Sequence, residues 1–294
     1  MLRTAATAAV LGLGVAQAAP PAEAFFKPAA LHEASLSPSG KRMALSVPAA
    51  NGRVGVFVVD LQGSEFSATR AVLFNDGDVP RVQWVDDERL VFSVTDLQAG
   101  LGEAYRYAPG LYAVRYDGKE LRYLAEMRGR PFVIGPDRVK SLPWNHVLLH
   151  VPTPSEDRAG ARTDEVIVGE MSFDREELRH IAPMWLNTRT GRTRTLDHER
   201  APCGVQRWWF SAQGEPRAAY CQDKGRESLH WLLAPRAGQP GRWQQLGEGP
   251  LYRMGLQPRW VGQGDTLYVE QPGGKAGESV LAPFDFAKSD TADD

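Results

Sequence analysis

The sequence predicts an all-β protein made of small antiparallel sheets that recur along the chain. Glycine and proline are frequent, with 29 and 21 among 294 residues, so turns are common and long helices are not expected. Short runs of β-branched and aromatic residues alternate with turn residues. About five such units follow one another, which favours a β-propeller of four-stranded blades over a non-repeating β-sandwich.

The first predicted blade shows the pattern most clearly. A strand at residues 34–37 leads into a turn, PSGK, at residues 38–41. Proline presets φ at the first central position of such a turn, and Gly40 accepts the positive φ that closes it. Strands at residues 42–47 and 55–61 complete the visible part of the blade.

The later blades follow the same order with different residues. The second turns at residues 86–88, the third at Asn145, and the fourth and fifth at residues 211–214 and 262–265. Such a spacing, roughly 50 to 70 residues, fits propeller blades enlarged by loop insertions. The turn markers are Gly40, Glu88, Asn145, Gly214 and Gly264.

Tryptophan precedes the turn in four of these blades. Large aromatic rings are usually buried, so we expect these side chains to lie between blades rather than to form a stacking platform for a ligand. They are Trp84, Trp144, Trp208 and Trp260. Two stretches break the strand pattern: residues 154–162 are expected to form a polar loop, and residues 174–180 one or two helical turns supported by opposite charges.

The N-terminus has the features of a secretory signal peptide. Arg3 precedes an apolar stretch at residues 4–15, and Ala16 and Ala18 form the small-x-small pattern of a cleavage site. We expect an exported protein, periplasmic or secreted; an uncleaved apolar N-terminus is the alternative. The predicted organisation is a signal peptide at 1–18, a lead-in at 19–33, a propeller domain at 34–287 and a frayed tail at 288–294.

Two cysteines, Cys203 and Cys221, flank a predicted hairpin in the fourth blade. An oxidising compartment would allow them to pair. A hairpin centred near residues 212 and 213 places the two positions almost opposite each other, within disulfide range. We therefore expect a structural disulfide, with two free buried thiols as the alternative.

Composition narrows the classes of partner. The chain has 34 Lys and Arg against 36 Asp and Glu, a net charge of −2, and so lacks the basic excess of a protein that binds nucleic acid or anionic membranes. No segment after the signal peptide approaches the length of a transmembrane helix. We expect neither nucleic acid nor, once the signal peptide is removed, a membrane as a partner.

No pattern for a cofactor, a metal ion or a catalytic group stands out. His146 and His150 share a predicted strand, where they would lie about 13 Å apart, too far for one zinc ion. Residues 75–78, NDGD, are rich in oxygen ligands but lack the later ligands of a calcium loop, so a turn between blades is expected. The predicted catalytic, cofactor and metal sets are all empty.

Two segments resemble a known family. SLSPSGKRMA, at residues 35–44, resembles the S-x-S-P-D-G-x-x-x-A signature shared by the propellers of prolyl-oligopeptidase-type (S9) serine peptidases and TolB-like proteins; Ser39 stands where aspartate is more common. VQWVDDERLVF, at residues 82–92, resembles exported bacterial dipeptidyl or acylaminoacyl peptidases of the same family. The resemblance covers about residues 25–270 and is strong over 34–94.

The resemblance implies a propeller of roughly seven or eight blades covering a C-terminal α/β-hydrolase domain, whose serine lies in a Gly-x-Ser-x-Gly elbow. That motif is absent from the chain, as is an alternating βα pattern. We therefore expect the catalytic domain to be missing and the chain to be inactive alone. With about five blades visible, an incomplete propeller is a further alternative.

The function that the resemblance implies is that of a lid and size filter. The partner that this function implies is a peptide substrate or a separate hydrolase domain. The inserted loops at residues 96–109 and 152–182 are the candidate regions of contact. Two other classes remain open. One is a stand-alone TolB-like scaffold that binds a protein across the propeller mouth, favoured by a full ring with its terminal strands closed and by an apolar patch at the rim. The other is a propeller hydrolase with a metal ion in its channel.

Overall fold

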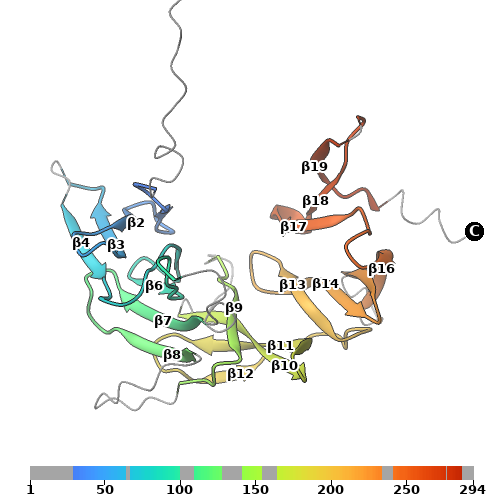
Figure 1. Ribbon diagram of the computed structural model, residues 1–294, viewed down its shortest axis with the longest axis horizontal. Helices are drawn as coiled ribbons and strands as arrows, with labels where there is room; N and C mark the ends of the chain where they lie inside the picture. The colour runs from blue at the N-terminus through green and yellow to red at the C-terminus, as the bar shows by residue number, and fades with distance from the viewer. Residues whose placement is uncertain are drawn as a thin grey trace, which may run out of the picture. The chain divides into compact units, whose positions relative to one another are not determined.

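The structure is a computed structural model in which five small antiparallel sheets follow one another along the chain, and it confirms the predicted all-β propeller fold (Figure 1). Among the described residues no helix is long and apolar enough to cross a membrane. The structure describes residues 29–63, 67–99, 109–127, 141–153, 164–233, 241–275 and 277–286.

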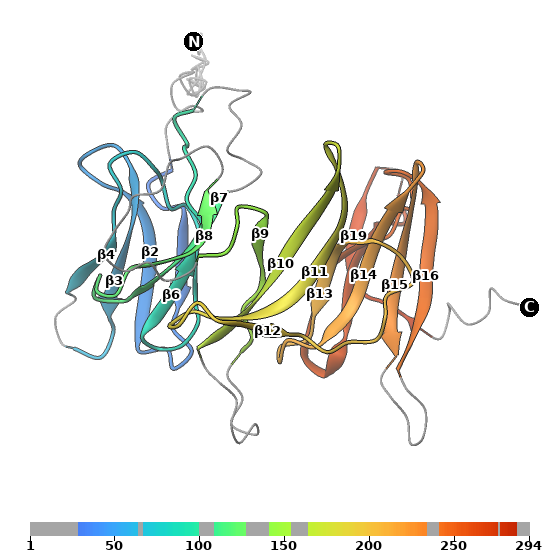
Figure 2. The same ribbon diagram turned by 90° about the horizontal axis from the view of Figure 1, so that it is seen from below.

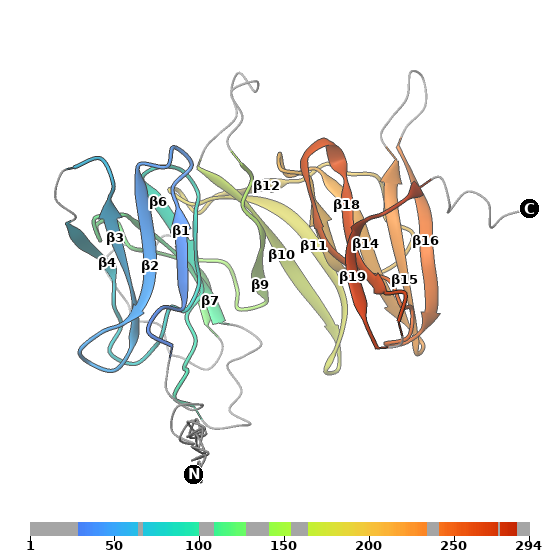
Figure 3. The same ribbon diagram turned by 90° about the horizontal axis from the view of Figure 1, so that it is seen from above.

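Four of the sheets have four described strands and the fifth has three (Figures 2 and 3). Blade 1 contains β1 (Glu33–Leu36), β2 (Arg42–Pro48), β3 (Val54–Asp60) and β4 (Ala68–Val72). Blade 2 contains β5 (Val82–Trp84), β6 (Arg89–Phe92), β7 (Pro109–Arg115) and β8 (Arg122–Met127). Blade 3 contains β9 (His146–His150), β10 (Glu165–Asp174), β11 (Glu177–Asn187) and β12 (Thr193–Thr195).

Blade 4 contains β13 (Val205–Phe210), β14 (Pro216–Asp223), β15 (Arg226–Leu233) and β16 (Arg242–Pro250). Blade 5 contains β17 (Gln257–Val261), β18 (Leu267–Pro272) and β19 (Ser279–Pro283). The first strands of neighbouring blades contact one another: β1 contacts β5, β9 contacts β13, and β13 contacts β17. This is the arrangement of the innermost strands in a propeller.

Apolar side chains fill the space between successive blades. In β6, Leu90 and Phe92 pack toward blade 1, whereas Val91, between them, packs toward blade 3. Successive side chains of a strand point to opposite faces, so a sheet covered on both sides needs apolar residues at every position. Burying a side chain such as Leu90 stabilises the fold by roughly 1.5–3 kcal/mol.

The third blade begins later than the sequence predicts. Its first strand is β9, and the segment before it belongs to the connection from blade 2, where Leu142 bridges Ala125. The backbone N–H of His146 donates to Pro143 O (3.2 Å), so the tight turn at Asn145 precedes β9. The turn after β9 is replaced by a long connection to β10, and Asn145 is therefore not equivalent to the other turn markers.

The predicted helical turns at residues 174–180 are wrong. This segment is the tip of the β10–β11 hairpin, in which Asp174 pairs with Glu177. Arg175 takes a positive φ of 57° in the two-residue turn. Opposite charges at helical spacing stabilise a helix by only tenths of a kcal/mol, and cross-strand pairs such as Met171 with Ile181 override them.

The tryptophans are only partly where the sequence predicts them. Trp84 and Trp208 are buried, with exposed fractions of 7% and 8%, but Trp260 is 45% exposed. Nor are their positions equivalent. The backbone hydrogen bond that closes each turn starts at Val85, Ser211 or Gly262. Trp84 lies one residue before it, Trp208 three and Trp260 two. Trp144 lies before the first strand of its blade.

Candidate functional site

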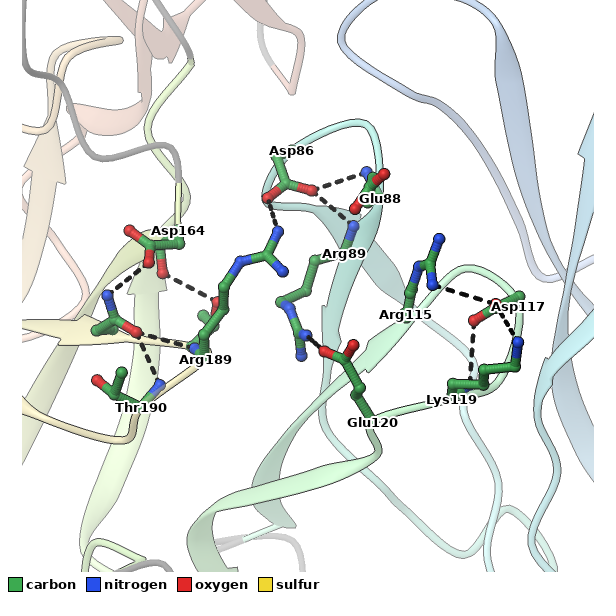
Figure 4. Close-up of polar contacts among 12 residues, drawn as sticks. Asp86, Glu88, Arg89, Arg115, Asp117, Lys119, Glu120, Asp164, Arg189 and Thr190 are labelled. Atoms are coloured by element: carbon green, nitrogen blue, oxygen red, sulfur yellow. Dashed lines mark hydrogen bonds and ion pairs between the residues drawn. The ribbon is translucent and has the colours of Figure 1, made fainter.

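Charged side chains from three turns meet where blade 2 lies against blade 3 (Figure 4). The turns are β5–β6, β7–β8 and β11–β12, and Asp164, just before β10, joins them at the same end of the blades. We use the term turn cluster for six residues at this junction: Asp86, Arg89, Glu120, Asp164, Asn187 and Arg189.

Asp86 connects its own turn to the next blade. One carboxylate oxygen, Oδ1, accepts hydrogen bonds from the backbone N–H groups of Glu88 and Arg89, both at 2.7 Å. The other oxygen, Oδ2, accepts one from Arg189 Nη2 in the β11–β12 turn at 3.0 Å. Aspartate side chains commonly bond the backbone two residues on, so the same residue shapes the turn and binds blade 3.

The β11–β12 turn is held in place before Arg189 reaches across. Asn187 Oδ1 accepts hydrogen bonds from the backbone N–H groups of Arg189 (3.0 Å) and Thr190 (2.8 Å). Asn187 Nδ2 donates to Asp164 Oδ2 at 2.7 Å. The buried Thr188 donates to the carbonyl oxygen of Asp164 through both its backbone N–H and its hydroxyl group. Arg189 therefore extends from a turn that is fixed by three polar neighbours.

Arg89 is the most buried charge of the turn cluster, with a side chain only 2% exposed. Its Nη2 donates to Glu120. Its Nε and Nη1 atoms have no acceptor among the described residues. Burial lowers the pKa of Arg89, the nearby charge of Arg189 lowers it further, and Glu120 opposes both effects. Two unpaired buried N–H groups give this side chain an unmet capacity for an oxygen acceptor.

A second ion-pair group lies in the β7–β8 turn beside the turn cluster (Figure 4). Asp117 Oδ2 lies 3.6 Å from Arg115 Nη1 and 3.4 Å from Lys119 Nζ. Burial raises the pKa of Asp117, but the hydrogen bond from the Lys119 backbone and the two positive charges outweigh it, so the pKa lies below its ordinary value. The carboxylate is therefore ionised at neutral pH.

Polar links also join the other blades at this end. Ser39 N donates to Asp87 Oδ1 (2.9 Å) between blades 1 and 2. Thr153 N donates to Ala212 O (2.8 Å) between the connection after β9 and blade 4. Arg217 of blade 4 lies 2.8 Å from Asp265 of blade 5. The turn end of the blades is thus a continuous row of inter-blade contacts, and the predicted PSGK turn takes part in it.

The turn cluster can hold blades together and accept a polar group, but it has no catalytic pair. None of its six residues is a nucleophile next to a base, and it holds three carboxylates against two guanidinium groups. Sequence reasoning placed Asp86 in a turn and missed its contact with Arg189, because 103 residues separate the two. Two successive aspartates in the β5–β6 turn were the available signal.

At the opposite end, Asp78 fastens three segments. Its side chain is 1% exposed, Oδ1 accepts from Val54 N (2.7 Å) and Oδ2 accepts from Leu97 N (2.9 Å) and Arg53 Nη1 (3.1 Å). Arg53 also bonds Asp96 at 2.6 Å. The NDGD segment is thus a structural connection between blades 1 and 2, and the buried oxygens of Asp78 are already occupied by N–H donors.

Cys203 and Cys221 form the expected disulfide, with their Cα atoms 6.2 Å apart. The pairing at Cys221 differs from the predicted hairpin by one residue, because Cys221 pairs with Val205, and Cys203 precedes β13. Irregularities next to Val205 and Phe210 shift the pairing along the hairpin. His230 lies beside the disulfide, within 4.8 Å, but bonded sulfurs are not thiolate ligands for a metal ion.

His146 and His150 lie in one strand, β9, and contact different residues. His146 Nδ1 contacts Pro143 O at 3.1 Å. His150 stacks on Phe210 of blade 4, with ring centroids 5.5 Å apart. Burial lowers the pKa of His150. Ala16 and Ala18, residues 288–294, the 154–162 loop and most of the 96–109 loop lie outside the described residues.

The chain matches no family model and no curated protein. It resembles several solved structures. A puromycin-hydrolysing peptidase from Mycobacterium tuberculosis is 15% identical, with a TM-score of 0.40 over 85% of this chain and 38% of that one. An acylaminoacyl peptidase from Pyrococcus horikoshii is 11% identical, with a TM-score of 0.37 over 87% and 44%.

A TolB structure from Agrobacterium tumefaciens is 12% identical, with a TM-score of 0.35 over 87% of this chain and 77% of that one. The chain spans 35% to 38% of the length of two puromycin hydrolases that it matches. The neighbours thus include propellers of S9 peptidases and of the TolB type. At these identities the likeness concerns architecture, and it carries no conclusion about activity.

Proposed function

We propose that this chain is the propeller part of an exported S9-like serine peptidase, and that it acts as a lid and size filter for peptide substrates of an α/β-hydrolase domain. The observation that supports this is the fold of the S9-like motif at residues 35–44. It forms the β1–β2 hairpin with Gly40 at a φ of 71°, and Ser39 bonds the second resembling segment at Asp87.

The motif thus joins two blades as well as turning the chain. A size filter needs blades that keep a fixed separation, and the row of contacts at the turn end would supply that rigidity. A peptide is selected by its ability to pass between fixed walls, so this role needs no catalytic residue on the propeller itself.

The test uses the purified chain after signal removal. It is incubated with chromogenic dipeptide and acyl-amino-acid substrates and, separately, with a serine-reactive fluorophosphonate probe. We expect neither turnover nor labelling by the chain alone, and we expect the immobilised chain to retain a probe-labelled hydrolase from an extract of its own compartment. Stoichiometric labelling of a serine in this chain would contradict the proposal.

One observation favours the alternative of a TolB-like scaffold. Blade 5 and the segment before it expose large apolar side chains, with exposed fractions of 83% for Tyr252, 54% for Leu281 and 45% for Trp260. Exposed apolar patches mark protein interaction sites, and a scaffold would bind its partner through side chains of this kind. In the retention experiment, a scaffold would hold a protein that the fluorophosphonate probe does not label.

A further inference from the structure

In blades 2 and 4, side chains just before the turn of the first hairpin cover the neighbouring blades. The residue directly before the turn covers the preceding blade: Trp84 Nε1 donates to Ser35 O of blade 1 at 2.9 Å. Phe210, at the equivalent position in blade 4, stacks on His150 of blade 3. Trp84 is 7% exposed and Phe210 is 5% exposed.

In blade 4 the residue one position earlier covers the following blade, whereas Gln83, at this position in blade 2, is exposed. Trp209 of blade 4 donates from Nε1 to Arg259 O of blade 5 at 3.3 Å. Trp209 also packs on the apolar cluster between these two blades, which includes Leu267 and Val269. Blade 4 therefore directs Phe210 toward blade 3 and Trp209 toward blade 5.

Blades 1 and 5 carry apolar side chains at these positions that no other described residue covers. Trp260 of blade 5 stands at the forward position that Trp209 occupies in blade 4, yet it is 45% exposed and stacks only on Tyr268 of its own blade. Leu36 of blade 1 stands at the backward position of Trp84, yet it is 59% exposed. The described part of the chain covers neither.

Further apolar side chains lie near both positions. Leu281 of β19 is 54% exposed and pairs with Glu270, so it shares the face of Tyr268, which points away from blade 4. Leu31, just before β1, is 51% exposed. A second sheet over these faces would remove the leucine and tryptophan side chains from water.

We propose that the outer face of blade 5 binds blade 1 of a second copy of this chain, head to tail. The contact extends the interface that already joins blades 4 and 5. In this contact the Trp260 indole lies over Leu36 of the second copy and donates to the carbonyl oxygen of Ala34 of that copy. Ala34 lies three residues before its turn, as does Arg259, whose carbonyl oxygen accepts from Trp209 between blades 4 and 5. Two such contacts related by a twofold axis close a ring of two chains. The proposal is independent of the function proposed above.

The first test measures the mass of the full chain by light scattering over a range of concentrations. We expect a dimer whose dissociation constant rises at least 10-fold in Trp260→Arg, because a charge would be buried in the contact. Tyr123→Arg is the matched control: Tyr123 is also 45% exposed but lies on the outer strand of blade 2. A monomer at all concentrations, or a dimer that Trp260→Arg leaves unchanged, would overturn the proposal.

The second test identifies the occupant by cross-linking. Trp260→Cys and Leu36→Cys are prepared as separate chains, and oxidation of their mixture should give a disulfide-linked dimer that neither variant gives alone. Cysteines bridge only when their Cα atoms come within about 7 Å. In the double variant, an internal disulfide in a monomer would show that the chain closes on itself and would overturn the proposal, as would the absence of any cross-link. Unchanged circular dichroism and melting confirm that the variants fold.

Discussion

Blade 2 and blade 5 begin with similar hairpins, but blade 2 is covered on both faces and blade 5 on one. In blade 2 every residue of β6 is buried, because blade 1 covers one face and blade 3 the other. In blade 5 one face packs on blade 4, while β19 is largely exposed. Trp84, which faces blade 1, is 7% exposed, whereas Trp260, which faces away from blade 4, is 45% exposed. The comparison shows that burial in a repeating fold depends on the neighbouring unit as much as on the residue.

The largest expected effect comes from removing side chains in the two blades. Leu90→Ala, in the core between blades 1 and 2, should lower the free energy of unfolding by about 2–5 kcal/mol, because it leaves a cavity. Leu281→Ala in blade 5 should change it by less than about 0.5 kcal/mol. Urea denaturation of both variants checks this, and equal losses would break the comparison.

Loss of the disulfide should have the second-largest effect on the free energy of unfolding, and the effect should be concentrated in blade 4. Cys203 and Cys221 close a loop with a sequence separation of 18, so replacing both with serine should cost about 3 kcal/mol. Hydrogen exchange should accelerate in β13 and β14 more than in β6. A uniform acceleration of exchange across all blades would contradict a local effect of the disulfide on blade 4.

Acid should loosen the attachment of blade 5. Glu227 Oε1 accepts hydrogen bonds from the backbone N–H groups of Arg253 and Met254, in the connection between blades 4 and 5. Burial raises the pKa of Glu227, but hydrogen bonds from Tyr220 and from these backbone groups outweigh it, so the pKa lies below its ordinary value.

A carboxyl group whose folded pKa is lowered stabilises the fold above its unfolded pKa, near 4.5, and loses that effect as pH falls through the folded pKa. The protection of β17 and β18 against hydrogen exchange, relative to the intrinsic rate at each pH, should therefore fall as the pH is lowered below about 4.5, by an amount equivalent to roughly 1–2 kcal/mol. Glu227→Gln should show the faster exchange already at neutral pH. Identical pH profiles for the two proteins would contradict the assignment.

The smallest expected effect concerns the charges of blade 2. Glu120→Gln leaves the guanidinium of Arg89 without its carboxylate and should cost about 1 kcal/mol, limited by the 56% exposure of the Glu120 side chain. Arg89→Met combined with Glu120→Gln should recover that loss, because the two unpaired N–H groups disappear with the charge. Thermal unfolding measures both; a double variant less stable than Glu120→Gln would show that Arg89 stabilises the fold on its own.

Local patterns predicted the first two blades, since each hairpin is specified by adjacent residues: PSGK at residues 38–41 and the aspartates after Trp84. The third blade was placed wrongly because its first two strands are joined by a long connection, so no turn motif marks them. The 174–180 hairpin was missed because its strands are stabilised by residues outside the segment.

The candidate site was less predictable than the fold. Asp86 could be assigned to a turn, but its contact with Arg189 depends on two blades meeting. No local pattern specifies which turn of blade 3 faces which turn of blade 2. The same limit applies to Asp78, whose residue type suggested a turn and whose burial depends on Val54 and Leu97 from two other segments.

The forward and backward side chains also bear on how such a chain can change in length during evolution. Trp209 reaches forward to a backbone carbonyl, as Trp84 reaches backward to one, and a carbonyl is present whatever the residue. A duplicated blade that carries such a tryptophan would therefore find an acceptor in its neighbour without a matching mutation. A junction of this kind tolerates a change in the number of blades, because its hydrogen bond does not depend on the neighbour's side chains.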